Sequence, residues 1–149
     1  MPNLLVIIAV WIIGFGLITF LGRKMIAWPF VHLSPLPKII NYFIILTPFV
    51  IVEEYLTCEI PFQQCIRFTI WGFWIMFLIL FLIHRFAGVP AIMACVIFGA
   101  MGWVNEFIIW KRLFIYSPAE IVIASIVAFL IYFVLAIPPS YYLEEARKS

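Results

Sequence analysis

The stretch Ile121–Leu143, IVIASIVAFLIYFVLAIPPSYYL, contains no charged residue. A helix needs about 20 apolar residues to cross the hydrocarbon core of a bilayer, and this stretch supplies them. The rest of the chain is similar, because 67% of all residues are hydrophobic and the mean hydropathy is +1.21. Charged residues make up only 11% and the net charge is +2, which does not favour a nucleic-acid partner. The composition therefore predicts an integral membrane protein.

Four further apolar runs each end at charged residues. They are residues 1–22 before Arg23, 39–52 before Glu53, 68–83 before His84-Arg85, and 86–105 before Glu106. Together with the first stretch they predict an all-α integral membrane protein, a polytopic bundle of about five transmembrane helices in one domain. The expected spans are residues 4–22, 39–56, 67–84, 88–110 and 118–138 of the single domain 1–149. We expect Pro48 to kink the second span, which leaves it a candidate for a broken or half-inserted helix.

The distribution of basic residues predicts the orientation. The first run has no basic residue before it and no small-residue cleavage pattern after it, so it is interpreted as an anchor rather than a signal peptide. With the amino terminus outside, the inner segments hold Arg23, Lys24, Lys38, Arg85, Arg147 and Lys148, and the outer segments hold Arg67, Lys111 and Arg112. This asymmetry follows the positive-inside rule, so we expect the amino terminus outside and the carboxyl terminus inside.

All acidic residues of the chain are glutamates, and most of them interrupt apolar sequence. Apart from the carboxyl-terminal tail, they all fall at the predicted outer face: Glu53, Glu54, Glu59, Glu106 and Glu120. A carboxylate in a membrane costs several kcal/mol unless it is paired, solvated or protonated. The cluster therefore indicates either salt bridges that secure helix ends or a dedicated site.

Local patterns separate these glutamates. Glu120 follows Ser117-Pro118, which predicts a capping box with serine at N-cap and proline at N1. Glu106 continues a stripe of small residues, Ala87, Ala91, Cys95, Gly99 and Gly102, so it should face protein rather than lipid. Glu106 is expected either to form a buried ion pair with Arg67 or Arg112, or to take part in a functional site. Asn105 should point about 100° away from Glu106 on an α-helix.

Glu53 and Glu54 are adjacent, so one should face the bundle and the other the headgroups. Two close carboxylates favour sharing a proton, which leaves one of them able to act as an acid. The pair resembles the glutamate pair of intramembrane CAAX-type proteases, but Cys58 stands where that motif has arginine and its histidine motifs are missing. Val52–Leu56 with Ile60–Phe62 resembles small membrane carotenoid cyclases, in which paired membrane carboxylates protonate a polyene; the resemblance is confined to this stretch.

The cysteines and histidines do not form a recognisable site. Cys58 and Cys65 flank a predicted outer loop, where they form either a disulfide or two free thiols. His32 and His84 are interpreted as polar residues at the inner interface. No zinc pattern, phosphate-binding loop or Ser-His-Asp order is present, so no metal and no cofactor are expected.

Three functions fit this sequence. The first is a small intramembrane protein that binds or transforms a lipid or isoprenoid substrate by acid–base chemistry. Its candidate catalytic residues are Glu53, Glu54 and Glu106, with Arg67 tuning them. The second is a non-catalytic subunit of a larger membrane complex, and the third is a cation or proton transport component. The expected partners are membrane lipids, with a second copy of the chain or a larger membrane complex as further candidates and nucleic acid excluded.

Overall fold

The computed structural model describes residues 7–57, 62–109 and 116–149, and within these ranges it contains helices and short connections but no strand. The elements, with η marking π-helix, are η1 (Ile7–Phe15), α2 (Gly16–Leu21), α3 (Arg23–His32), α4 (Lys38–Thr57), α5 (Phe62–Ala87), α6 (Ala91–Val104), η2 (Asn105–Ile109) and α7 (Pro118–Lys148). The predicted all-helical class is therefore confirmed.

Two of the described helical segments are long and apolar enough to cross a membrane, Ala91–Ile109 and Pro118–Lys148. A third candidate is formed if the bent pair Ala9–Leu21 and Arg23–His32 counts as one span. Trp71–Ala87 is apolar but shorter. Large apolar side chains are exposed on these helices, among them Leu21, Ile75 and Val122, as a lipid-facing surface requires. The structure thus supports a membrane-associated protein with two to three candidate spans.

Helix α7 does not end at Pro138-Pro139, as the sequence predicted, but continues through both prolines to Lys148. Each proline removes one backbone hydrogen bond from the helix. The helix tolerates the loss because this segment is enclosed by neighbouring helices, and Pro138, Pro139 and Ser140 are all buried. Packing against other elements therefore overrides the local helix-breaking signal.

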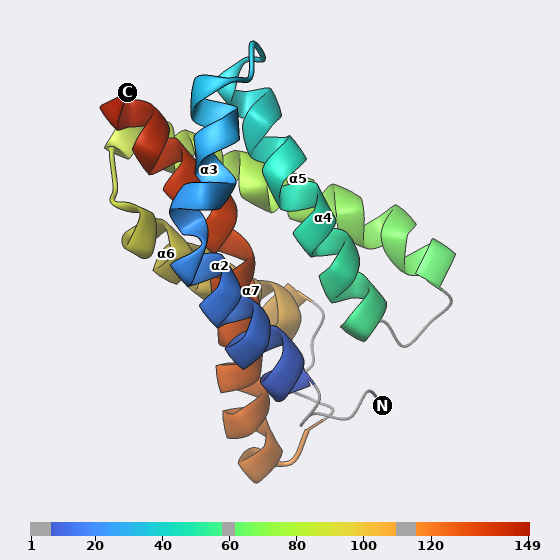
Figure 1. Cartoon of the computed structure of the whole chain (residues 1–149). Helices are drawn as coiled ribbons and strands as arrows, with labels where there is room; N and C mark the ends of the chain where they lie inside the picture. Colours follow the sequence, from blue (N-terminus) through green and yellow to red (C-terminus); the bar gives the residue numbers. More distant parts are fainter. Residues whose placement is uncertain (1–6, 58–61, 110–115) are drawn as a thin grey trace.

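The segment predicted as an inner loop, residues 23–38, contains helix α3. The axis bends by 51° between Leu21 and Arg23, so α3 turns away from α2 and lies along the carboxyl-terminal half of α7 (Figure 1). Aromatic contacts hold both helices against α7. The ring of Phe20, in α2, lies 6.0 Å from that of Tyr141, and the ring of Phe30, in α3, lies 6.4 Å from that of Tyr142, which is buried.

Helices α4 and α6 both run antiparallel to α7. The Lys38 ammonium at the start of α4 donates to the carbonyl of Ala146 at 2.7 Å, and the backbone N–H of Ala91 at the start of α6 donates to Glu144 Oε2 at 2.7 Å. Both starts are thereby held at the carboxyl-terminal end of α7. Helix α4 remains continuous through Pro48. Toward its end at Thr57 it leads away from α7, and α5 begins on that same side (Figure 1).

Candidate functional site

The contact between α6 and α7 is built from the small-residue stripe predicted in the sequence. Ala91, Cys95, Gly99 and Gly102 are all buried. A Cβ atom added to Gly99 would lie 2.8 Å from Phe129 Cε2, and one added to Gly102 would overlap the ring of Tyr132. Only a residue without a side chain lets α7 approach α6 so closely. The predicted stripe is confirmed from Ala91 to Gly102, and it positions Tyr132 against the end of α6. Its first predicted member, Ala87, is instead exposed at the end of α5, because the chain turns between α5 and α6.

The buried Tyr132 hydroxyl is the centre of a hydrogen-bonded group whose other members, Asn105 and Glu106, are half-buried. It donates to Glu106 Oε1 at 2.8 Å and accepts a hydrogen bond from Asn105 Nδ2 at 3.1 Å. Its ring stacks on Phe73 at a centroid distance of 5.3 Å and contacts Phe98 at 5.8 Å. Tyr132 is only 4% exposed, so these contacts hold its hydroxyl at a fixed point inside the bundle.

Asn105 and Glu106 both reach Tyr132, although the sequence predicted that they point in different directions. The reason is local, because the helix changes from α to π at Asn105 and remains π through Ile109. A π-helix is wider, so successive side chains are rotated by a smaller angle than on an α-helix. Single π-turns of this kind are frequent at functional sites. Here the wide turn places an amide and a carboxylate on the same hydroxyl.

Glu53 and Glu54 are both buried at the end of α4, with exposed fractions of 5% and 6%. The prediction that only one of them faces the bundle is therefore wrong. Helix α4 has neighbours on several sides, since it contacts α5, α7 and η1. The Glu53 carboxylate also interacts electrostatically with the Tyr132 hydroxyl, as the Glu106 carboxylate does. Glu53 of α4 and Glu106 of η2 therefore both act electrostatically on one tyrosine of α7, and Glu106 is also hydrogen-bonded to it.

Most of the other predicted site residues have side chains outside the described part of the chain. Arg67 lies on α5, but its side chain is outside the described part of the chain, as are Cys58, Glu59, the Cys65 side chain, Lys111 and Arg112. Glu120 has the predicted structural role. Its Oε2 accepts hydrogen bonds from the Ser117 backbone N–H at 2.9 Å and from the Ser117 hydroxyl at 2.7 Å, which completes the capping box.

Tyr132 was missed in the sequence because it lies in an uninterrupted apolar run. A signal was present nonetheless, since a tyrosine hydroxyl in the middle of a predicted span requires a hydrogen-bond partner there. Two partners in the sequence, Asn105 and Glu106, lie at the end of the preceding predicted span. Their meeting point depends on how far α6 and α7 slide along each other, which the sequence does not specify.

The arrangement can donate, accept and relay a proton. Tyr132 can pass a proton to Glu106 while its oxygen stays held by Asn105. Among the side chains that the structure describes, no group of three or more His, Cys, Asp or Glu residues could hold a metal ion.

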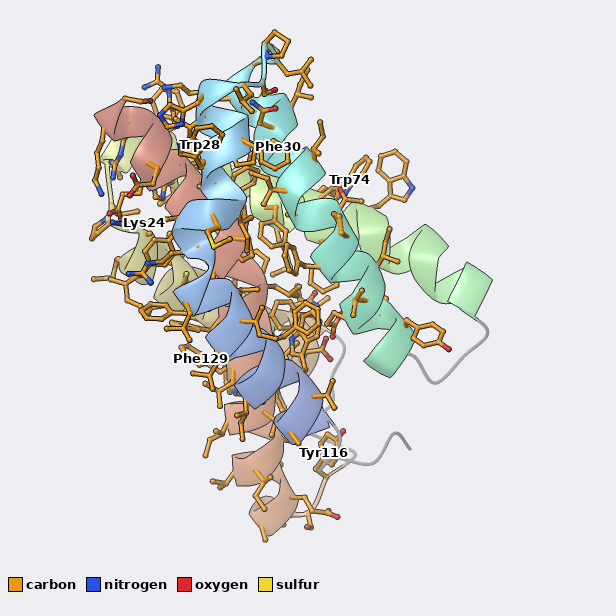
Figure 2. The ribbon with its side chains drawn as sticks, viewed as in Figure 1. Lys24, Trp28, Phe30, Trp74, Tyr116 and Phe129 are labelled. Carbon is orange, nitrogen blue, oxygen red and sulfur yellow. The ribbon has the colours of Figure 1, made fainter. Side chains whose placement is uncertain are left out.

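The described part of the chain has two surface cavities near its helices that are not lined by Glu53, Glu54 or Glu106. One is an apolar groove of about 620 Å³ between α4 and α5, lined by residues of α4 from Ile39 to Pro48 and by Trp74 of α5. Trp74 projects beside α4 in Figure 2. The other, about 320 Å³, lies between α3 and the end of α7 and is lined by Lys24, Trp28 and Lys148 among others.

The two histidines differ in their environment. His32 is exposed, as predicted for an interfacial residue, and its Nδ1 lies 3.0 Å from the carbonyl oxygen of Trp28. His84 was also predicted at the interface, but it is only 1% exposed. It is buried because it lies on the same face of α5 as Phe77 and Phe81, which packs into the bundle.

No family model matches the chain, and comparisons with curated proteins and with solved structures find no match. Functional inference therefore depends on the geometry of the residues described above.

Proposed function

We propose that this protein binds the hydrocarbon chain of a lipid or isoprenoid within the membrane and acts on it by acid–base chemistry. The observation that carries the proposal is the hydrogen bond between Glu106 and the buried Tyr132 hydroxyl, on which the buried Glu53 of another helix also acts electrostatically. Buried carboxylates are costly in a membrane protein, and they are commonly kept for a function. Arg67 is the proposed electrostatic partner of this group.

The apolar groove supports a hydrocarbon substrate. Phe43 and Thr47 line it, and Glu54 follows them on α4 at spacings of 11 and 7 residues. At 100° per residue these spacings bring Glu54 to within about 20° of both, so it continues the face of α4 that lines the groove. A chain lying in the groove therefore extends toward the carboxylates at the end of α4.

In the proposed reaction, Glu53, Glu54 or Glu106 donates a proton to a carbon–carbon double bond of the substrate. The proton leaves the carboxyl oxygen, a new C–H bond forms, and positive charge develops on the neighbouring carbon. The carboxylate left by the donor would stabilise that charge, and so would the aromatic faces of Phe43 and Trp74, which line the groove. Loss of a proton from the cation to a carboxylate, relayed through Tyr132, would restore the site.

We also propose that all five predicted segments cross the membrane, with the amino terminus outside. The alternation of direction is in agreement with this, since α4 and α6 run opposite to α7. Single cysteines placed at Leu36, before α4, and at Ala119, at the start of α7, should then react with a membrane-impermeant thiol reagent from opposite sides. Intact and permeabilised vesicles distinguish the two faces. Labelling of both positions from one side would contradict the five-span topology.

Photo-crosslinking tests the proposed binding. The purified full chain is exposed to a diazirine-bearing polyisoprenoid and to a diazirine-bearing fatty acid, and the adducts are mapped by mass spectrometry. We expect adducts along α4 from Ile39 to Pro48 and on Trp74. Thr47→Trp, which fills the groove, should reduce them about tenfold, corresponding to about 1.4 kcal/mol of binding free energy.

The matched control is Leu78→Trp, a substitution on α5 at a lipid-exposed position that does not line the groove. It should leave the adducts unchanged. Equal labelling of Thr47→Trp, Leu78→Trp and the unmodified chain would mean that the probe samples the whole lipid-facing surface. That result would contradict a substrate site in the groove.

A further inference from the structure

Buried polar side chains form a second group, away from the carboxylates. Tyr42 is 0% exposed and His84 is 1% exposed. The Tyr42 hydroxyl and both ring nitrogens of His84 have no hydrogen-bond partner among the residues that the structure describes. A polar group buried in this way destabilises the fold unless it is hydrogen-bonded, and where no protein group does so an ordered water molecule can.

Helix register places Tyr42 and Cys95 at one depth. Lys38 is bonded to the carbonyl of Ala146, so Tyr42, one turn further along α4, comes level with the α7 residues one turn before Ala146. Ala91 is bonded to Glu144, so Cys95, one turn further along α6, comes level with Ser140 in the same way.

Direct interactions agree with this register. The Cys95 thiol and the Ser140 hydroxyl are both buried, and the Ser140 hydroxyl, like that of Tyr42, has no hydrogen-bond partner among the described residues. Cys95 also interacts electrostatically with Tyr42. The ring of Tyr42 lies 5.3 Å from that of Phe81, which precedes His84 by one turn of α5. Side chains from α4, α5, α6 and α7 therefore surround one region inside the bundle.

The polar end of α7 closes this region. Glu144 and Arg147 both interact electrostatically with His84. Glu144 accepts from Ala91, and Arg147 Nη2 donates to the carbonyl of Val89 at 3.3 Å. These groups are partly exposed, so they offer water a polar path from the end of the bundle to His84. On the other side, Phe77 and Phe98 stack at 4.0 Å and separate the region from Tyr132.

We propose that Tyr42, His84, Cys95 and Ser140 line a buried water-binding site near the carboxyl-terminal end of α7. Separate water molecules in this site bond the two ring nitrogens of His84: one donates to the unprotonated nitrogen, and another accepts from the N–H. Water in the site also bonds the Tyr42 hydroxyl. The site exchanges water with that end of the bundle through the Glu144–Arg147 region. It is distinct from the carboxylate group and does not depend on the function proposed for it.

Cys95 is a native reporter for this site. In a full chain with Cys58→Ala and Cys65→Ala, Cys95 carries the remaining thiol, whose S–H stretching band is resolved in the infrared spectrum. After transfer into D2O, we expect fast conversion of the Cys95 S–H to S–D. The matched control moves the thiol to an apolar environment by combining Cys95→Ala with Val134→Cys, since Val134 is buried in the core. The control thiol should exchange about 100-fold more slowly, because it must await a local opening.

Two further variants test the lining residues. Tyr42→Phe keeps the ring contacts, and His84→Leu removes the ring nitrogens; each should slow exchange of Cys95 about tenfold, because a bound water is lost. Circular dichroism and the thermal transition report whether each variant folds. If the His84→Leu protein does not fold, the Tyr42→Phe protein alone is sufficient for the test. Exchange of Cys95 as slow as in the control overturns the proposal. Fast exchange that Tyr42→Phe leaves unchanged overturns it equally, because opening of the bundle then explains the exchange.

Discussion

Among the glycines of the described chain, Gly102 should be the one whose replacement by alanine destabilises the protein most. The new Cβ would overlap the Tyr132 ring, which contacts Phe73 and Phe98 and is anchored by the hydrogen bonds of its hydroxyl. Helices α6 and α7 would have to separate, and overpacking of this kind costs about 1–3 kcal/mol. We expect a corresponding fall in the thermal transition of the purified protein, measured by circular dichroism in detergent.

Gly72→Ala is the matched control for this substitution. Gly72 also lies within a helix, but a Cβ there meets no atom within 4 Å. Replacing a helical glycine by alanine in open space should stabilise the protein by about 0.5–1 kcal/mol. A Gly102→Ala protein as stable as the Gly72→Ala protein would mean that α6 and α7 do not pack as described.

The features that the sequence predicted well depend on one helix at a time. The apolar runs define α6 and α7 to within a few residues at their starts, the small residues from Ala91 to Gly102 define the face of α6, and Ser117 with Glu120 defines a helix start. Hydrophobic length, spacing along a helix and capping are local properties, so they can be derived without knowing the neighbours. The five-span topology and its orientation remain predictions.

The features that were predicted wrongly depend on neighbours. Glu53 and Glu54 are both buried because several elements surround the end of α4, although helix geometry alone sends them in different directions. Pro138 lies inside a continuous helix for the same reason. His84 is buried because α5 packs by the face that carries it. The candidate site shows the same limit, since Tyr132 became part of it only through the close approach of α6 and α7.

Removing the Tyr132 hydroxyl should break the link between Asn105, Glu106 and helix α7. Tyr132→Phe keeps the ring between Phe73 and Phe98, but it takes a donor from Glu106 and an acceptor from Asn105. Leaving buried polar groups without their partner costs about 1–3 kcal/mol. Glu106→Gln should cost less, because the amide oxygen can still accept from Tyr132. The free energy of unfolding in detergent gives both values.

A double-mutant cycle of Tyr132→Phe and Glu106→Gln then measures the coupling itself. Residues that share a hydrogen bond show interaction energies of about 0.5–3 kcal/mol, whereas independent residues add to within about 0.5 kcal/mol. We expect a clear interaction energy for this pair. The comparison pair is Tyr132→Phe with Glu120→Gln, because Glu120 is bonded to Ser117 at the start of α7 and should be independent of Tyr132. If both pairs are additive, Glu106 and Tyr132 do not act as a unit, and the carboxylates lose the relay on which the proposed proton transfer depends.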